Sequence, residues 1–147
     1  MKKRIAFVSV LLLALSIQTA EAAVKVTVLN PSKVSTKTGL VTLTVSGLPT
    51  DHGIYISQCM GIDKATKVPS ACNPAKASKL WISNLVADQK MGAKSGKGKL
   101  TLKVDKYFKD GDCIHTKCII YVRNDHNAKG KNATQAIPFK FGGINLF

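Results

Sequence analysis

Apolar and polar residues alternate along most of this chain with a period of two. The segment 24–28 is an example, with three valines separated by lysine and threonine. Such alternation is typical of strands that turn one face to a core and the other to water. The pattern recurs in seven segments: 24–28, 41–46, 54–56, 80–86, 100–104, 120–123 and 137–141.

Turn-forming residues separate these segments, and no stretch keeps a helical period. Glycine, proline, asparagine and aspartate gather between the predicted strands, for example at 30–32, 47–49 and 110–112. Short strands of this number predict an all-β fold, a seven-stranded antiparallel sandwich of immunoglobulin-like type. Pro138 has no N–H to donate, so its strand is expected at a sheet edge or with that position unpaired.

The first 22 residues have the features of a secretion signal. A basic start at 2–4 precedes an apolar run at 5–17, and the small-x-small sequence at 20–22 resembles a cleavage site. The apolar run is shorter than the roughly 20 residues needed to span a bilayer. We therefore expect a signal peptide at 1–22, no transmembrane anchor, and one secreted, monomeric domain at 23–147.

Four cysteines in an exported chain predict two disulfides. They could pair in three ways, and the simplest joins Cys59 to Cys72 and Cys113 to Cys118, so that each bond closes a short loop. The alternative is a metal held by Cys113, Cys118 and the intervening His115, but zinc usually takes four ligands. Export favours the disulfides.

A copper site is a second metal-binding alternative. His52, His115 and His126 could join Met60 or Met91, because imidazole and sulfur both suit copper. These residues do not cluster in the sequence, so ordinary surface histidines are the simpler interpretation. The chain also contains neither a nucleophile-elbow motif nor a glycine-rich phosphate loop. We therefore predict no metal, no cofactor and no enzymatic activity.

The chain is strongly basic. Its 22 lysine and arginine residues against 8 acidic residues make a formal net charge of +14, and loss of residues 1–22 would leave +12 (19 − 7). Arg123 is the only arginine that would remain, and lysines attract polyanions as point charges without reading sequence. Lysines are densest between Lys90 and Lys109. They could dock the protein weakly on DNA or an anionic wall polymer, or simply keep it soluble.

Several motifs, taken in order, resemble the neocarzinostatin family of secreted actinobacterial chromoprotein apoproteins. They are a strand at 54–59 ending in Gln-Cys, the segment Ala71-Cys72-Asn73-Pro74-Ala75, the late pair Cys113 and Cys118, and Ile137-Pro138-Phe139. The resemblance covers nearly all of residues 23–147 and implies a seven-stranded sandwich with two local disulfides. It also implies that an enediyne antibiotic, a labile DNA-cleaving molecule, is bound, protected and carried in a cleft beside a small hairpin.

The resemblance also marks positions in that cleft. The family's aromatic loop residue is kept here as Phe108, next to Tyr107. Two further aromatic positions of the family fall on Gly61 and Ala77, and its small hydroxyl residue falls on Arg123. The cleft is therefore expected to be wider or differently shaped, and Arg123 would favour a ligand with an acid group.

These observations lead to a hypothesis about function. The chain is expected to be a secreted, non-enzymatic protein that holds an apolar or aromatic small molecule near Phe108, Trp81 and the 59–72 hairpin. Trp81 is the only tryptophan and serves either the core or the wall of the cleft. Antibiotic carriage and antimicrobial action are what the resemblance implies. The alternative is a cationic cell-surface protein that binds anionic polymers through its lysines.

Overall fold

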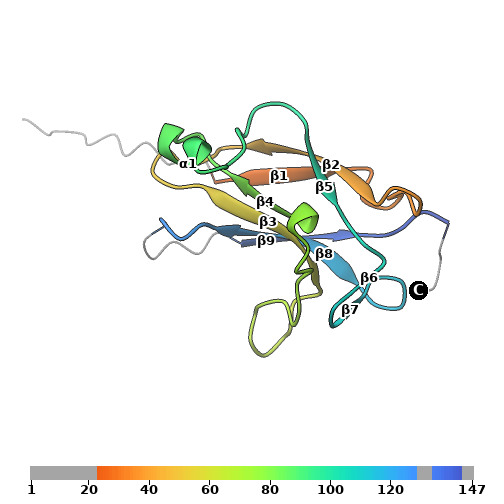
Figure 1. Ribbon diagram of the computed structural model, residues 1–147. Coiled ribbons are helices and arrows are strands. Elements are labelled where there is room, and N and C mark those ends of the chain that lie inside the picture. Colours follow the sequence, from red (N-terminus) through yellow and green to blue (C-terminus); the bar gives the residue numbers. More distant parts are fainter. Residues whose placement is uncertain (1–22, 129–133, 144–147) are drawn as a thin grey trace, which may run out of the picture.

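The computed structural model describes residues 23–128 and 134–143, so the predicted signal peptide at 1–22 lies outside the described residues. The described chain forms nine strands and two short helices (Figure 1). The helices are η1 (Lys76–Ser78), a 3-10 helix, and α1 (Val86–Lys90). The strands are β1 (Lys25–Leu29), β2 (Leu40–Ser46), β3 (Ile54–Met60), β4 (Lys79–Ile82), β5 (Leu100–Lys103), β6 (Tyr107–Phe108), β7 (Gly111–Asp112), β8 (Cys118–Asn124) and β9 (Thr134–Phe139).

Seven of these strands form two antiparallel sheets that pack face to face. One sheet has the strand order β1-β2-β5 and the other the order β4-β3-β8-β9. This arrangement confirms the predicted immunoglobulin-like sandwich. The strand count is nine rather than seven because β6 and β7 form a separate ribbon. Strands of two residues are too short to show alternation, so the sequence pattern does not predict them.

The alternating residues form the core between the two sheets. Val41 and Leu43 of β2 are buried, and so are Ile56 of β3 and Ile120 of β8 in the opposite sheet. Every second side chain of a strand points to the same face, so these apolar residues meet in one cluster. Pro138 lies in β9 at the edge of the four-stranded sheet, as predicted.

The segment 80–86 is a correction to one predicted strand. β4 ends at Ile82, and the chain begins α1 at Val86 after a polar turn. The side chain of Gln89 in α1 donates a hydrogen bond to the Ser83 carbonyl (3.0 Å). This bond occupies the Ser83 carbonyl, which would otherwise be available to pair with a neighbouring strand if β4 continued. A helix of five residues is too short to show a helical period in the sequence.

Both predicted disulfides are present. The Cα atoms are 3.9 Å apart in Cys59–Cys72 and 5.3 Å apart in Cys113–Cys118. The first bond joins β3 to the segment before η1, and the second closes the turn between β7 and β8. Because Cys113 and Cys118 are bonded to each other, the alternative of a zinc site with His115 is excluded.

Gln58 and Asn73, two residues of the quoted motifs, form a buried polar network beside Cys59–Cys72. The Gln58 side-chain oxygen accepts hydrogen bonds from the Asn73 side chain (2.8 Å) and the Asp105 amide (2.9 Å). Its nitrogen donates to the Asp105 carbonyl (2.6 Å), and Asn73 in turn accepts from the Ala75 amide (3.0 Å). A fully paired buried network specifies one arrangement of the chain. It therefore positions η1, which follows Ala75 directly.

Candidate functional site

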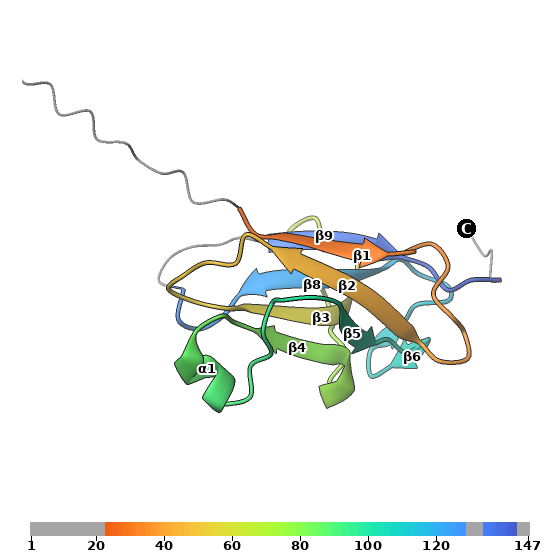
Figure 2. The ribbon, with the colours of Figure 1, turned by 90° about the horizontal axis from the view of Figure 1, so that it is seen from above.

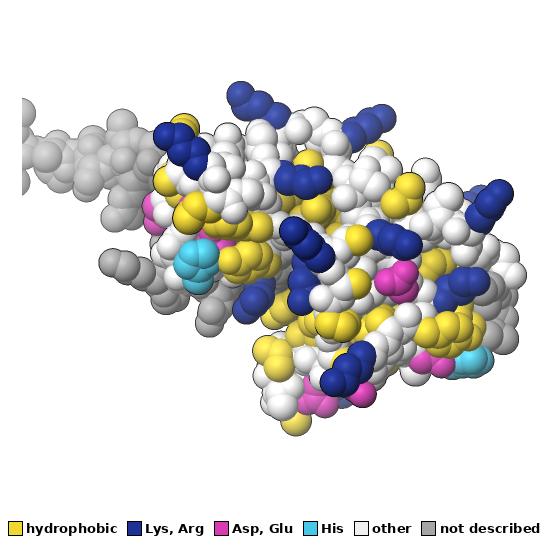
Figure 3. Space-filling model, in the orientation of Figure 1, with side chains coloured by type: hydrophobic (Ala, Val, Ile, Leu, Met, Phe, Trp, Pro, Cys, Tyr) yellow, Lys and Arg dark blue, Asp and Glu magenta, His cyan; other side chains and the backbone are white. Residues whose placement is uncertain are grey.

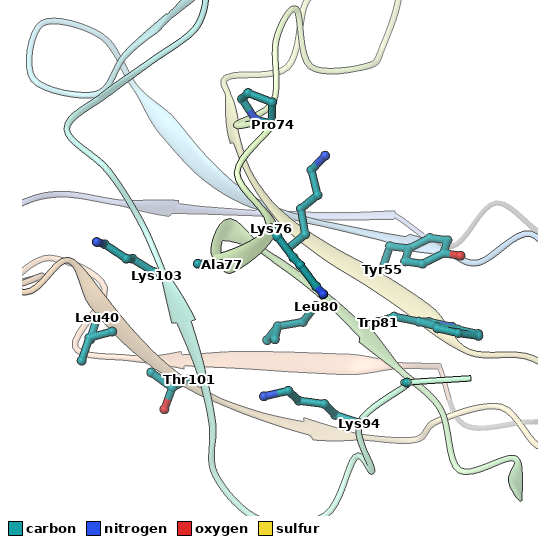
Figure 4. A pocket seen from close by; sticks show the side chains of 12 residues that line it. Leu40, Tyr55, Pro74, Lys76, Ala77, Leu80, Trp81, Lys94, Thr101 and Lys103 are labelled. Carbon is teal, nitrogen blue, oxygen red and sulfur yellow. The ribbon is translucent and has the colours of Figure 1, made fainter. Parts of the chain in front are cut away.

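A groove of about 800 Å³ lies on one side of the sandwich, where the edge strand β4 of one sheet faces the edge strand β5 of the other. Figure 4 shows an aromatic pair on one side of this β4–β5 groove, residues of β2 and β5 on the other, and η1 between them. The groove is lined by Leu40, Tyr55, Pro74, Lys76, Ala77, Lys79, Leu80, Trp81, Gly92, Lys94, Thr101 and Lys103.

Tyr55 and Trp81 form what we call the aromatic wall of the groove. They are cross-strand neighbours on β3 and β4, with ring centroids 6.1 Å apart. The indole Nε1 of Trp81 donates a hydrogen bond to the Asp125 carboxylate (3.0 Å), and the same oxygen accepts from the Gly53 amide (2.9 Å). Asp125 is itself buried. A buried carboxylate held by a backbone amide therefore fixes the orientation of the indole.

Tyr55 is held from two further directions. Its hydroxyl is 2.7 Å from Nδ1 of His126, whose ring stacks on the phenol at 6.2 Å between centroids. The guanidinium carbon of Arg123 lies 5.3 Å from the centre of the Tyr55 ring, a cation–π contact. Partial burial and the charge of Asp125 raise the pKa of Tyr55 above its ordinary value, although Arg123 lowers it. The ring is therefore neutral at neutral pH, and its hydroxyl is engaged outside the groove lining.

Four lysines surround the groove: Lys76, Lys79, Lys94 and Lys103. All four are exposed, and they come from η1, β4, the segment after α1, and β5. None of the acidic residues within the described ranges belongs to the groove lining. Lysines that converge on a hollow with apolar walls create a positive potential inside it. The groove thus combines an aromatic surface with a basic rim.

Three of the residues predicted from the sequence lie in or against this groove. Trp81 and Ala77 belong to its lining. Arg123 does not line the groove but covers the Tyr55 ring of the aromatic wall. Arg123 was predicted to lie in the cleft and to contact an acid group of the ligand directly. In the structure the cations of the groove lining are the four lysines.

The other three predicted residues lie elsewhere. Phe108 is half-buried in β6, packs against the core, and extends its ring over Gly111, its partner in β7. Tyr107 beside it is 59% exposed. The Gly61 amide donates to the Lys117 carbonyl (3.0 Å). None of these belongs to the lining of the β4–β5 groove, and their part in ligand binding stays a prediction.

The sheet face next to the 59–72 hairpin is largely covered. Ile119 and Tyr121 of β8 form a small buried cluster there with Cys59. Their side chains fill the surface beside the disulfide that the sequence analysis expected to border a cleft. The aromatic wall of the β4–β5 groove lies further along β3 and β4, at Tyr55 and Trp81, and ligand binding beside the hairpin stays a prediction.

The histidines have separate partners. His52 is buried and contacts Asp51 (2.5 Å), His115 contacts Asp112 (2.7 Å), and His126 contacts Tyr55. The described residues contain no group of three or more histidine, cysteine, aspartate or glutamate residues with the geometry of a metal site. The Asp112 carboxylate accepts the hydrogen bond from His115, which lowers the pKa of Asp112 below its ordinary range.

Tyr55, one of the two residues of the aromatic wall, is not among the site residues predicted from the sequence. Its position between Ile54 and Ile56 indicates that its side chain faces away from the core. That signal alone does not show which residue lies beside it. The register of β3 with β4 sets Tyr55 opposite Trp81, and the register with β8 sets it opposite Arg123.

Fold and groove together define a small, disulfide-bonded β-sandwich protein with a hollow of the size that drug-sized ligands occupy, roughly 300–1,000 Å³. No family model and no curated protein matches the chain. Solved structures similar to it include macromomycin, at 22% identity over 80% of this chain and 99% of that chain, and apokedarcidin, at 24% identity over 82% and 100%. The TM-score is 0.48 for each.

Macromomycin and apokedarcidin are apoproteins of the neocarzinostatin family, which the sequence motifs resemble. At this identity and TM-score the similarity carries no information on what this chain binds. In addition, none of the helices in the described residues has the length and apolar character needed to cross a bilayer.

Proposed function

We propose that this chain is a secreted, non-enzymatic protein that binds an apolar or aromatic small molecule in the β4–β5 groove. The observation that carries the proposal is the aromatic wall, whose rings line the groove while their polar ends are bonded elsewhere. Aromatic side chains supply large contact areas, and rings held in place before binding lose little freedom when the ligand arrives.

Carriage of an antibiotic is the role that the resemblance adds to this proposal. Family members carry an enediyne, and Ala77 stands where they have a bulky aromatic, which leaves room in the groove lining of this chain. Antimicrobial action and association with DNA would then belong to the carried molecule. The signal-like segment 1–22 supports release from the cell. Native mass spectrometry of protein taken from the culture medium tests carriage, because a carrier should retain an added mass that denaturation releases.

A titration tests whether the groove is the binding site. Trp81 is the only tryptophan, so its fluorescence reports directly on the aromatic wall. We expect a flat neutral probe, anthracene-2-carboxamide, to quench Trp81, and Tyr55→Leu to weaken binding about fivefold, since one lost aromatic contact is worth about 1 kcal/mol. Tyr107→Leu, a tyrosine outside the groove lining, is the matched control. Weaker binding by the control alone would move the site to the β6–β7 ribbon.

Docking on anionic polymers is the second candidate function. Each lysine in the described residues is exposed, and four of them surround the groove. This candidate predicts retention on a heparin matrix that falls steeply with salt. Tyr55→Leu would leave that retention unchanged, because the attraction depends on charge and not on ring contacts. Retention that does not depend on salt would rule it out.

A further inference from the structure

We infer that the ligand of the β4–β5 groove is a flat aromatic acid, held by its ring on the aromatic wall and by its anionic group at the groove lysines. This inference rests on the proposed function and specifies the class of ligand. It extends the acid-group expectation, which the sequence attached to Arg123, to a different set of cations.

The ring half of the ligand follows from how the aromatic wall is bonded. The indole nitrogen of Trp81 is already used by Asp125, and the hydroxyl of Tyr55 is already used by His126. The wall therefore offers ring faces and not hydrogen-bonding groups. A flat, unsaturated body matches such a surface, and a ligand that needs polar partners there would leave its own groups unpaired.

The acid half follows from the charges of the lining. None of the four groove lysines is paired with a carboxylate within residues 23–128 and 134–143. The two acids whose charges act on Tyr55 are buried: Asp125 holds the indole, and Asp88 lies in α1. A carboxylate, sulfonate or phosphate entering the groove would thus meet lysines that have no competing partner, whereas a cation would be repelled.

The layout sets the ring and the charge at different places in the groove. Figure 4 shows Lys103 on β5 across the groove from Trp81, and Lys94 at the end of the hollow between them. Leu40, which is 50% exposed, lies on the same side as Lys103 and extends the apolar surface. A ligand with its rings on the wall would direct an acid group toward Lys94 and Lys103. A hollow of about 800 Å³ suits a small molecule better than a polymer.

A matched pair of probes tests this inference. Anthracene-2-carboxylate and anthracene-2-carboxamide have the same ring and nearly the same shape, and only the first is charged at neutral pH. We expect calorimetric titration at low salt to give about fivefold to tenfold tighter binding of the carboxylate, because exposed ion pairs are individually modest. High salt should remove most of that difference.

A pair of double variants localises the effect. Lys94→Gln with Lys103→Gln removes two of the four groove lysines and should lower the ratio of carboxylate to amide affinity about threefold or more. Lys25→Gln with Lys64→Gln changes the net charge equally at two exposed lysines outside the lining and should leave both affinities unchanged. Equal melting temperatures for the three proteins show that the fold is intact.

The contrary outcomes are distinct. Equal binding of the two probes overturns the inference and leaves the proposed function standing. Failure of both probes to bind overturns the inference together with the proposed function. An equal loss of carboxylate affinity in both double variants assigns the attraction to net charge and overturns the groove assignment. A single-stranded oligothymidine that displaces the carboxylate and binds more tightly would overturn it in favour of a nucleic-acid surface.

Discussion

The sandwich has two sides at which edge strands of its two sheets meet, and these two sides are built differently. On one side β1 and β9 are the edge strands of the two sheets, and Gln135 of β9 links them. Its side-chain oxygen accepts from the Val26 amide (2.9 Å) and its nitrogen donates to the Val24 carbonyl (3.1 Å). A side-chain amide thus takes the place of a neighbouring strand, and we call this the closed side. On the other side, which we call the open side, β4 and β5 face each other across the groove (Figure 2).

The difference shows how one fold separates stability from binding. An edge strand exposes unpaired backbone groups, and the Gln135 amide satisfies those of β1 at the closed side. At the open side the edge of β4 pairs with a short segment, since the Lys94 amide donates to the Trp81 carbonyl (2.8 Å) and the Lys94 carbonyl accepts from Ser83 (3.0 Å). The side chains there remain available to line a hollow. In Figure 3, lysines are spread over the face of the molecule seen in Figure 1, with apolar surface between them.

Breaking the network that anchors the open side should have the largest effect. Gln58→Leu leaves the Asp105 backbone groups without their side-chain partner and removes one hydrogen bond of Asn73, so we expect a loss of about 3–5 kcal/mol in the free energy of unfolding. Chemical denaturation measures it. Gln89→Leu, which removes a single hydrogen bond at an exposed glutamine, is the control and should cost about 1 kcal/mol or less. Equal losses for the two variants would contradict a structural role for the network.

Removing the hydrogen bonds of Gln135 at the closed side should have the next largest effect on stability. Gln135→Leu removes both links to β1, and we expect a loss of about 1–3 kcal/mol, because a backbone amide loses its partner. Ligand affinity should not change, since Gln135 is not in the groove lining. Thermal melting and probe titration measure the two quantities. Reduced affinity at unchanged stability would show that the two sides are not separate in function.

Filling the open side should affect binding more than folding. Ala77 is exposed in the groove lining, so Ala77→Phe should lower probe affinity about tenfold while stability stays within about 0.5 kcal/mol. Ala136→Phe places the same ring on an exposed position of β9 and should change neither quantity. Tighter binding in the Ala77→Phe protein would mean that the added ring extends the aromatic wall.

The smallest expected effect concerns the proton of Tyr55. Burial, Asp125 and Asp88 together place the pKa of Tyr55 above 10.0, so the folded protein holds this proton more tightly than the unfolded chain. The resulting stability is complete below pH 10 and is lost as the pH rises through the raised pKa. Asp125→Asn should bring the pKa closer to 10.0. Tyrosinate absorbance, compared with a Tyr55→Phe protein, measures the shift. A pKa that does not respond to Asp125→Asn would contradict the contribution of Asp125 and leave burial and Asp88 as the causes that raise it.

Local spacing predicted much of the fold. The alternation at 41–46 places Val41 and Leu43 on one face whatever strands lie beside them, so strand and burial could be inferred together. The disulfides could also be predicted from the sequence, because the sequence separation is only 5 for Cys113 and Cys118 and 13 for Cys59 and Cys72. Elements without a period were not: α1 and the β6–β7 ribbon depend on hydrogen bonds such as that of Gln89 to Ser83.

The chain by itself therefore determined the sandwich, its core and its disulfides, since these follow from periodicity and from cysteines close in sequence. The groove was decided by the tertiary structure. Tyr55 meets Trp81 through the register of β3 with β4, and Asp125, 44 residues further along, fixes the indole. Lys103 reaches the groove because the chain crosses between sheets before β5. Contacts between residues so distant in sequence depend on how the strands are ordered in the sheets. Local alternation of apolar and polar residues does not predict that order.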